Sequence, residues 1–202
     1  IKGGIFAQEI VPVTIQTRKG DTVVDTDERP METDMAKMAK LKPAFKKDGT
    51  VTAGNASGIN DGAGAVVLMN AERAAAMGLT PIVSIRSFAS GGLDPAYMGL
   101  GPIPSVRKAL KAAAMTIDDI RMIELNEAFA SQAIACMREL GIATDKPNEL
   151  GSGISLGHPI GATGARQMIS GMNQMRRKGY DTGLITMCIG GGMGMAMVIE
   201  RS

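Results

Sequence analysis

A chain of 202 residues is long enough for one domain with its own hydrophobic core, or for one domain and part of another. Its formal net charge of +2 and aromatic content of 3% exclude the basic surface and base-stacking side chains of a nucleic-acid-binding protein, so we expect no nucleic-acid partner. Two cysteines are too few for a disulfide framework, which favours a reducing compartment, and we expect the cytoplasm.

The first 80 residues combine two strands, a short helix and a glycine-rich loop that leads into a further strand and helix. The expected strands are 5–17, 22–28 and 65–69, and the expected helices are 33–42 and 71–78. Lys19 and Gly20 supply a turn between the first two strands, and Pro43 stops the first helix. Gly78 suits the C-cap of the second helix. We expect strand 65–69 to be buried, because it is a continuous apolar run.

From residue 81 onward, strands and helices alternate regularly. The expected strands are 82–88, 121–125, 152–156, 184–189 and 193–200, and the expected helices are 104–115, 127–140 and 161–178. The last two helices are followed by Gly141 and Gly179, which are typical helix ends. This alternation predicts an α/β fold of order βαβαβαββ, with a layered, mixed but mostly parallel sheet flanked by helices.

The uncharged run 183–199 has the composition of a membrane segment. It is shorter than the ~20 residues that a span needs, and glycines interrupt it, so we expect no membrane association. The chain also opens without a basic-then-apolar segment, and no signal peptide is expected. Because it begins at Ile1 and not at a methionine, we expect it to be a piece of a longer polypeptide.

Reactive side chains stand at the ends of three predicted strands. Asn126 follows strand 121–125, His158 follows strand 152–156, and Cys188 closes strand 184–189. Because such strand ends meet helix N-termini at one edge of a sheet, we expect these three side chains to converge. One histidine and two scattered cysteines do not supply a metal-ligand set, so we expect no metal.

A lone histidine is ordinarily structural. Here Gly157 allows close backbone approach and Pro159 fixes the local φ, which indicates that the His158 imidazole is held in a defined orientation. Cys136 shares a helical face with apolar residues and is expected in the core. Cys188 instead adjoins glycines whose backbone donors are free. Taken alone, the Cys–His–Asn set permits a thiol hydrolase in which Cys188 is the nucleophile.

Five ordered segments closely resemble the signature blocks of thiolases, the acetyl-CoA C-acetyltransferases. They are 51–69, 98–110, 126–130 (NEAFA), 157–166 (GHPIGATGAR) and 188–194 (CIGGGMG). The thiolase fold consists of two similar α/β halves. The resemblance implies that 81–202 is the C-terminal domain, that 59–80 is a strand and helix of the N-terminal domain, and that 1–58 is the tail of the loop region. The resemblance further implies that roughly the first half of the polypeptide, with the nucleophilic cysteine, lies outside this chain.

The resemblance also implies a role for each polar residue, and these roles differ from those of a thiol hydrolase. The residue matching Cys188 is an acid/base that exchanges the α-proton of acetyl-CoA. The match to His158 activates the nucleophile and donates to an oxyanion hole, and the match to Asn126 holds a water of that hole. The backbone N–H matching Gly190 serves a second oxyanion hole.

The implied reaction is the Claisen condensation of two acetyl-CoA to acetoacetyl-CoA and CoA, or the reverse thiolysis, in fatty acid metabolism. Ala53 and Ser57 match residues lining the pantetheine tunnel. Met98 and Phe129 match residues beside the acyl site, although plain core packing explains them equally well. The implied partners are CoA thioesters as substrates, with no further cofactor, the N-terminal half, and further copies in a dimer or tetramer.

The chain alone is expected to be inactive. The alternative is a non-catalytic subunit, built on a thiolase half, that binds CoA thioesters or serves as a structural component.

Overall fold

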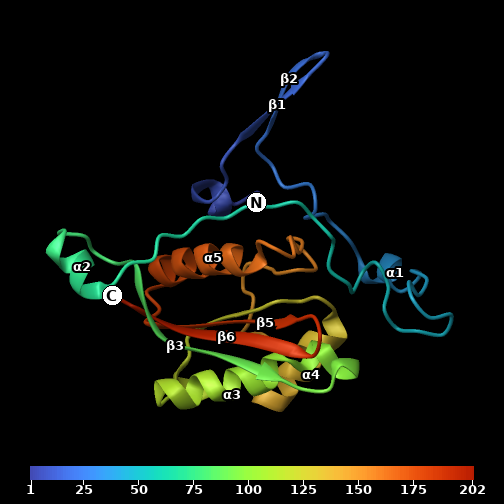
Figure 1. Cartoon of the computed structure of the whole chain (residues 1–202). Coiled ribbons are helices and arrows are strands. Elements are labelled where there is room, and N and C mark those ends of the chain that lie inside the picture. Colours follow the sequence, from blue (N-terminus) through green and yellow to red (C-terminus); the bar gives the residue numbers. More distant parts are fainter.

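The computed structural model describes all residues from 1 to 202 (Figure 1). The strands are β1 (Val13–Thr17), β2 (Gly20–Val24), β3 (Val83–Gly92), β4 (Met122–Leu125), β5 (Thr182–Ile189) and β6 (Met193–Arg201). The α-helices are α1 (Met35–Met38), α2 (Ala71–Ala76), α3 (Pro102–Ala113), α4 (Ala130–Leu140) and α5 (Thr163–Lys178). Short 3-10 helices are η1 (Ile5–Gln8), η2 (Pro95–Leu100) and η3 (Ile117–Asp119). None of the helices combines the length and the apolar character needed to cross a bilayer.

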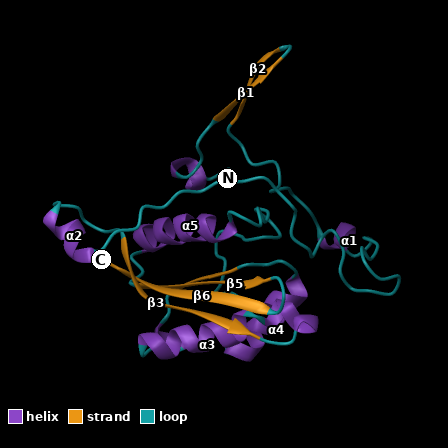
Figure 2. Ribbon diagram, in the orientation of Figure 1, coloured by secondary structure: helices purple, strands orange, loops and turns teal.

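The main sheet has four strands in the order β3-β6-β5-β4 (Figure 2). The predicted α/β class with a mixed, layered sheet is confirmed, but the expectation that the sheet is mostly parallel is wrong. Only β4 and β5 run parallel, whereas β6 is antiparallel to both β5 and β3. The reason is the three-residue turn 190–192, which is too short for a crossover and returns β6 alongside β5.

Helices cover both faces of this sheet. Helices α3 and α4 lie on one face and α5 lies on the other (Figure 1). The larger core cluster joins α3 and α4 to the sheet through fully buried residues such as Val106, Leu125 and Leu184. The α5 side holds only a small apolar cluster, and Gln167 and Gln174 of α5 are also buried there. The α5 face of the sheet is therefore the more polar of the two, and Asn126 follows Met122 and Glu124 onto it. By contrast, Cys188 alternates with Ile185 and faces α3 and α4 like Leu184.

Two predicted strands are absent. Residues 152–156 form consecutive turns, in which the Leu156 N–H donates to the Ser152 carbonyl at 2.7 Å. Gly151 and Gly157 flank this segment with φ of +91° and +104°, a left-handed backbone that does not continue a strand. The order therefore has one strand fewer than βαβαβαββ.

The second absent strand is 65–69, which was expected to be buried. Residues 60–69 make no backbone hydrogen bond, and Val67 is 91% exposed. A strand is stable only beside a neighbouring strand, and this chain places none there. The following helix, α2, forms as expected, with Asn70 as its N-cap and Gly78 at φ +68° beyond its end.

The first 58 residues form an extended excursion from the main body. The hairpin β1–β2 projects away from the sheet, and every residue of its strands is exposed (Figure 1). Residues 5–8, expected within the first strand, form η1 instead and lie against α5, where Ser170 donates to the Glu9 carboxylate at 2.6 Å. Helix α1 is a single turn that is capped by Asp34.

Cys136 is fully buried in the core cluster, which confirms its expected structural place. Burial raises the pKa of its thiol from 9.0 to about 11. The folded chain therefore keeps a proton that the unfolded chain loses above pH ~9, so stability is lost as the pH rises from ~9 towards ~11. We expect this thiol to account for about 2 kcal/mol of that loss.

Urea unfolding of the wild-type chain and of Cys136→Ala across this pH range measures the contribution. The variant should start less stable but lose less stability with rising pH. Burial also raises the pKa of Cys188, so a residual slope of the same sign is expected. Equal slopes in the two proteins would contradict the assignment.

Candidate active site

Three loops at one end of the sheet carry the candidate residues. Asn126 directly follows β4, and its N–H donates to the Thr186 carbonyl of β5 at 3.0 Å, which extends the parallel ladder by one residue. His158 lies in the loop between α4 and α5, and Cys188 lies near the end of β5. The Asn126 Nδ2 and His158 Nε2 atoms are 3.3 Å apart. The expected convergence of the asparagine and the histidine is therefore present.

The imidazole of His158 is held from both sides. Its Nδ1 lies 2.7 Å from the Thr163 hydroxyl oxygen, and that hydroxyl donates to the Pro159 carbonyl at 2.9 Å. A hydroxyl has one hydrogen, so Thr163 accepts from Nδ1–H. The other nitrogen, Nε2, then has no hydrogen and accepts from the Asn126 amide. This network assigns the neutral tautomer that carries its hydrogen on Nδ1 and its lone pair on Nε2.

The electrostatic setting agrees with a neutral imidazole. Burial, and secondly the Arg166 charge, lower the pKa of His158 below its ordinary value of 6.5. Asn126 is itself fully buried, and its Oδ1 has no hydrogen-bond partner. A buried amide oxygen without a partner is costly, so this atom is a ready acceptor for a water or a substrate donor.

Cys188 is buried and pairs across the sheet with Gly194 of β6. Its thiol makes no hydrogen bond to Asn126 or His158. Burial raises the pKa of this thiol, so it carries its proton at neutral pH. The structure therefore presents Cys188 as a proton donor and not as a preformed thiolate–imidazolium pair.

The turn after Cys188 is built from glycines. Gly191 and Gly192 have φ of +79° and +82°, and a Cβ on Gly192 would lie 2.3 Å from the Leu93 carbonyl oxygen. Gly190 is exposed, and its N–H donates no backbone hydrogen bond. It is therefore a free donor, two residues beyond Cys188.

An extended segment, 55–59, ties the asparagine and histidine loops together. The Ala130 N–H donates to the Asn55 carbonyl and the Ser57 N–H donates to the Ala128 carbonyl, each at 2.9 Å. The His158 N–H donates to the Gly58 carbonyl at 3.0 Å. These contacts keep the backbone extended through residue 129, and for this reason α4 begins at residue 130 and not at the expected 127.

Three of the four expected substrate-binding residues lie in or beside this segment, and the fourth, Met98, lies in η2. Ala53 is in an exposed turn, and Ser57 is half-buried in segment 55–59. Phe129 caps α4 and packs edge-on against Phe45, with ring centroids 6.2 Å apart. Met98 is half-buried in η2, which packs against both α4 and β5. The Ser57 backbone and Phe129 belong directly to the asparagine loop and its partner strand, whereas no hydrogen bond joins Ala53 or Met98 to that loop.

Sequence reasoning missed three residues that support this site. They are Thr163, Glu124 and Arg166. Thr163 could have been found, since a hydroxyl five residues after His158, at a helix start, can reach back to it. The Glu124–Arg166 ion pair spans 42 residues and has no local signal.

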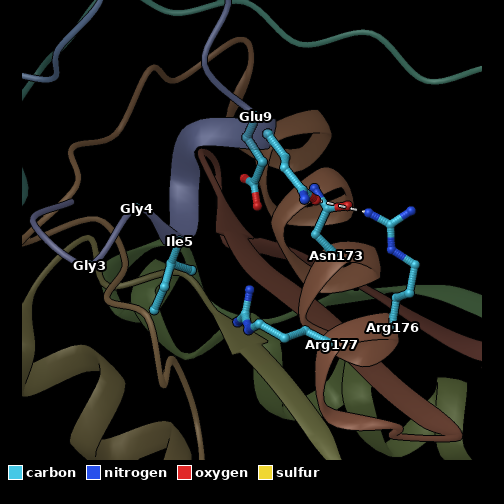
Figure 3. Close-up of a pocket in the computed structure, with 8 residues that line it drawn as sticks. Gly3, Gly4, Ile5, Glu9, Asn173, Arg176 and Arg177 are labelled. Carbon is cyan, nitrogen blue, oxygen red and sulfur yellow. Dashed lines mark hydrogen bonds between the residues drawn. The ribbon is translucent and has the colours of Figure 1, made fainter.

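A separate cavity of about 670 Å³ lies between η1 and α5 (Figure 3). Its lining residues are Gly3, Gly4, Ile5, Gln8, Glu9, Asn173, Arg176 and Arg177. The Arg176 side chain donates to Gln8 at 3.1 Å across it. This cavity includes none of the candidate catalytic residues. No group of three or more histidine, cysteine or carboxylate side chains is placed to hold a metal ion.

Comparisons with known proteins extend over the whole chain. Residues 79–201 match the thiolase C-terminal domain and residues 1–72 match the thiolase N-terminal domain. An acetyl-CoA acetyltransferase of Syntrophomonas wolfei is 55% identical over 99% of this chain and 51% of its own. A β-ketoadipyl-CoA thiolase of Pseudomonas aeruginosa is 52% identical over 99% of this chain and 51% of its own.

Among solved structures, the Bacillus anthracis acetyl-CoA acetyltransferase superposes with a TM-score of 0.97 at 45% identity. That match covers 100% of this chain and 51% of the other. The chain therefore spans about half the length of the relatives that it matches.

Proposed function

Because the chain belongs to the thiolase family, we propose that it is the C-terminal part of an acetyl-CoA acetyltransferase that uses an acyl-cysteine intermediate. The observation that carries the proposal is the His158 imidazole, held between Thr163 and Asn126 with Nε2 free of a proton. The proposed reaction is the condensation of two acetyl-CoA to acetoacetyl-CoA and CoA, or its reversal by thiolysis. CoA thioesters are the substrates, and no further cofactor takes part.

In the thiolysis direction, His158 Nε2 accepts the proton of a nucleophilic thiol supplied by the N-terminal half. The thiolate attacks the 3-keto carbon of acetoacetyl-CoA, and the bond between C2 and C3 breaks. Cys188 Sγ–H then protonates C2 of the departing acetyl-CoA, a step that suits a thiol whose pKa is raised by burial. In the condensation direction, the thiolate form of Cys188 takes the α-proton and so returns to the thiol.

Charge develops on thioester and ketone oxygens in both directions, so fixed donors are required. The unpaired Oδ1 of Asn126 can accept a hydrogen bond from a water beside His158, and that water is one such donor. The free N–H of Gly190 supports a second hole for the tetrahedral intermediate of the acyl-enzyme. The Asn126 backbone extends the β4–β5 ladder, and Gly190 lies in the three-residue turn that joins β5 to β6.

The missing partner in this scheme is the N-terminal half of the polypeptide. Two observations support it: the relatives are about twice as long, and segment 63–69 is apolar, exposed and without backbone partners. We propose that this segment becomes a strand when the sheet of the other half lies beside it. Dimers or tetramers of the complete protein are part of the same proposal.

A thiolysis assay with acetoacetyl-CoA and CoA tests the proposal. The 202-residue chain alone should show no turnover, because it lacks the nucleophile. Joined to the N-terminal half of the native polypeptide, it should turn over. A parallel assay with β-ketoadipyl-CoA shows which of the two substrates, each taken from the name of a relative, is cleaved faster. Turnover by the isolated chain, or none by the joined protein with any 3-ketoacyl-CoA, contradicts the proposal.

A further inference from the structure

A buried ion pair lies directly behind the Asn126–His158 pair. Glu124 precedes Asn126 by two residues along the β4 ladder, so the two side chains leave the same face of the sheet. Arg166 follows Thr163 by three residues on α5, which is about one helical turn. The ion pair therefore joins the same two elements, β4 and α5, that supply Asn126 and Thr163 to the imidazole.

The pair is poorly compensated. Glu124 is only 1% exposed and its Oε2 lies 3.3 Å from Arg166 Nη1, whereas Nε and Nη2 of Arg166 are buried without any partner. Burial raises the pKa of Glu124 to about 7 in spite of the arginine. Below neutral pH the carboxyl group is therefore increasingly protonated, and the Arg166 charge is left without its counter-ion. That is the range in which an ordinary histidine becomes charged.

Other charged or titratable groups surround His158 but are engaged elsewhere or face solvent. Glu127 accepts from the Asn148 amide at 3.0 Å, and Arg29 donates to the Ala56 and Ile154 carbonyls. Asp61 is exposed and directly precedes Gly62, which packs against the Pro159 ring. The Cys188 thiol on β5 is neutral at this pH. The guanidinium of Arg166 is thus the buried charge that acts on the imidazole.

We propose that Arg166, fixed in place by Glu124, is a positioning residue that keeps His158 uncharged, with Nε2 as a proton acceptor, across the neutral and mildly acidic range. A second positive charge on the imidazole, beside a buried guanidinium, is unfavourable because a low-dielectric interior screens it weakly. The catalytic use of this state rests on the proposed function. The protonation state itself does not, and it can be measured without turnover.

The chain contains a single histidine, so NMR titration of the ring resonances, on protein freed of any histidine tag, reports His158 alone. In the wild-type chain the midpoint should lie below 6.5, and the nitrogen shifts should identify the Nδ1–H tautomer. Arg166→Gln should raise the midpoint by about 0.5 pH units or more. Arg166→Lys, which keeps the charge, should remain close to wild type, and so should Arg107→Gln, which removes an exposed cation on α3.

Three outcomes overturn the proposal: a wild-type midpoint at or above 6.5, no shift in Arg166→Gln, or an equal shift in Arg166→Lys. Amide spectra of β4 and β5 verify that each variant is folded, and Arg166→Met replaces the glutamine variant if that variant unfolds. If both neutral variants unfold, a wild-type midpoint at or above 6.5 or a shift in Arg166→Lys still overturns the proposal. Absence of thiolysis in the joined protein would refute the proposed function and leave these titrations unaffected.

Discussion

Replacement of Cys188 by serine, in the chain joined to its N-terminal half, is expected to lower the rate of thiolysis by about 10²–10⁴-fold, the usual contribution of a general acid or base. A serine hydroxyl fits the same space but is a far weaker acid than a thiol. Acylation of the nucleophile by acetyl-CoA should persist, because that step depends on His158. Steady-state thiolysis measures the first effect, and intact mass after incubation with acetyl-CoA measures the second.

The matched control is the other cysteine of the chain. Cys136 lies in the core, and Cys136→Ala should retain turnover per folded molecule, although it is less stable. Undiminished thiolysis by Cys188→Ser contradicts the acid/base role. An acyl group found on Cys188 itself would instead restore the thiol-hydrolase interpretation, in which this residue is the nucleophile.

Gly194→Ala should have the largest effect on stability, a loss of more than ~4 kcal/mol or complete failure to fold. A Cβ at this position would lie 2.1 Å from both the carbonyl carbon and the oxygen of Gly101, and 2.7 Å from the Pro102 nitrogen. These are backbone atoms at the start of α3, so no side-chain rotation relieves the overlap. Strand β6 would have to move away from α3, and Gly194, which pairs with Cys188 across the sheet, would move with it.

Gly190→Ala is the control for this substitution. A Cβ there meets no atom within 4 Å, and its φ lies outside the left-handed region. The free energy of unfolding, from urea titration followed by circular dichroism, should therefore stay within ~0.5 kcal/mol of wild type. A Gly194→Ala protein that unfolds at nearly the wild-type urea concentration would show that β6 and α3 adjust more freely than their contact allows.

Elements with a strong local pattern were predictable from the sequence. Helices α4 and α5 end where Gly141 and Gly179 supply a left-handed residue, with φ of +70° and +68°. Strands β5 and β6 follow from apolar runs on either side of a glycine turn. The failures, 65–69 and 152–156, are apolar runs whose state depends on a neighbouring strand or on flanking glycines.

The candidate site divides in the same way. Residue type and position at a strand end sufficed to select Asn126 and Cys188, because the geometry of an α/β sheet brings strand ends to one edge. His158 was selected from a strand that does not form, and its contacts with Asn126 and Thr163 are what place it in the site. The tautomer of the imidazole, the unpaired Asn126 oxygen and the Glu124–Arg166 pair behind them were decided only by the tertiary structure. These properties depend on burial and on contacts between residues far apart in the chain, and a linear pattern of residue types encodes neither.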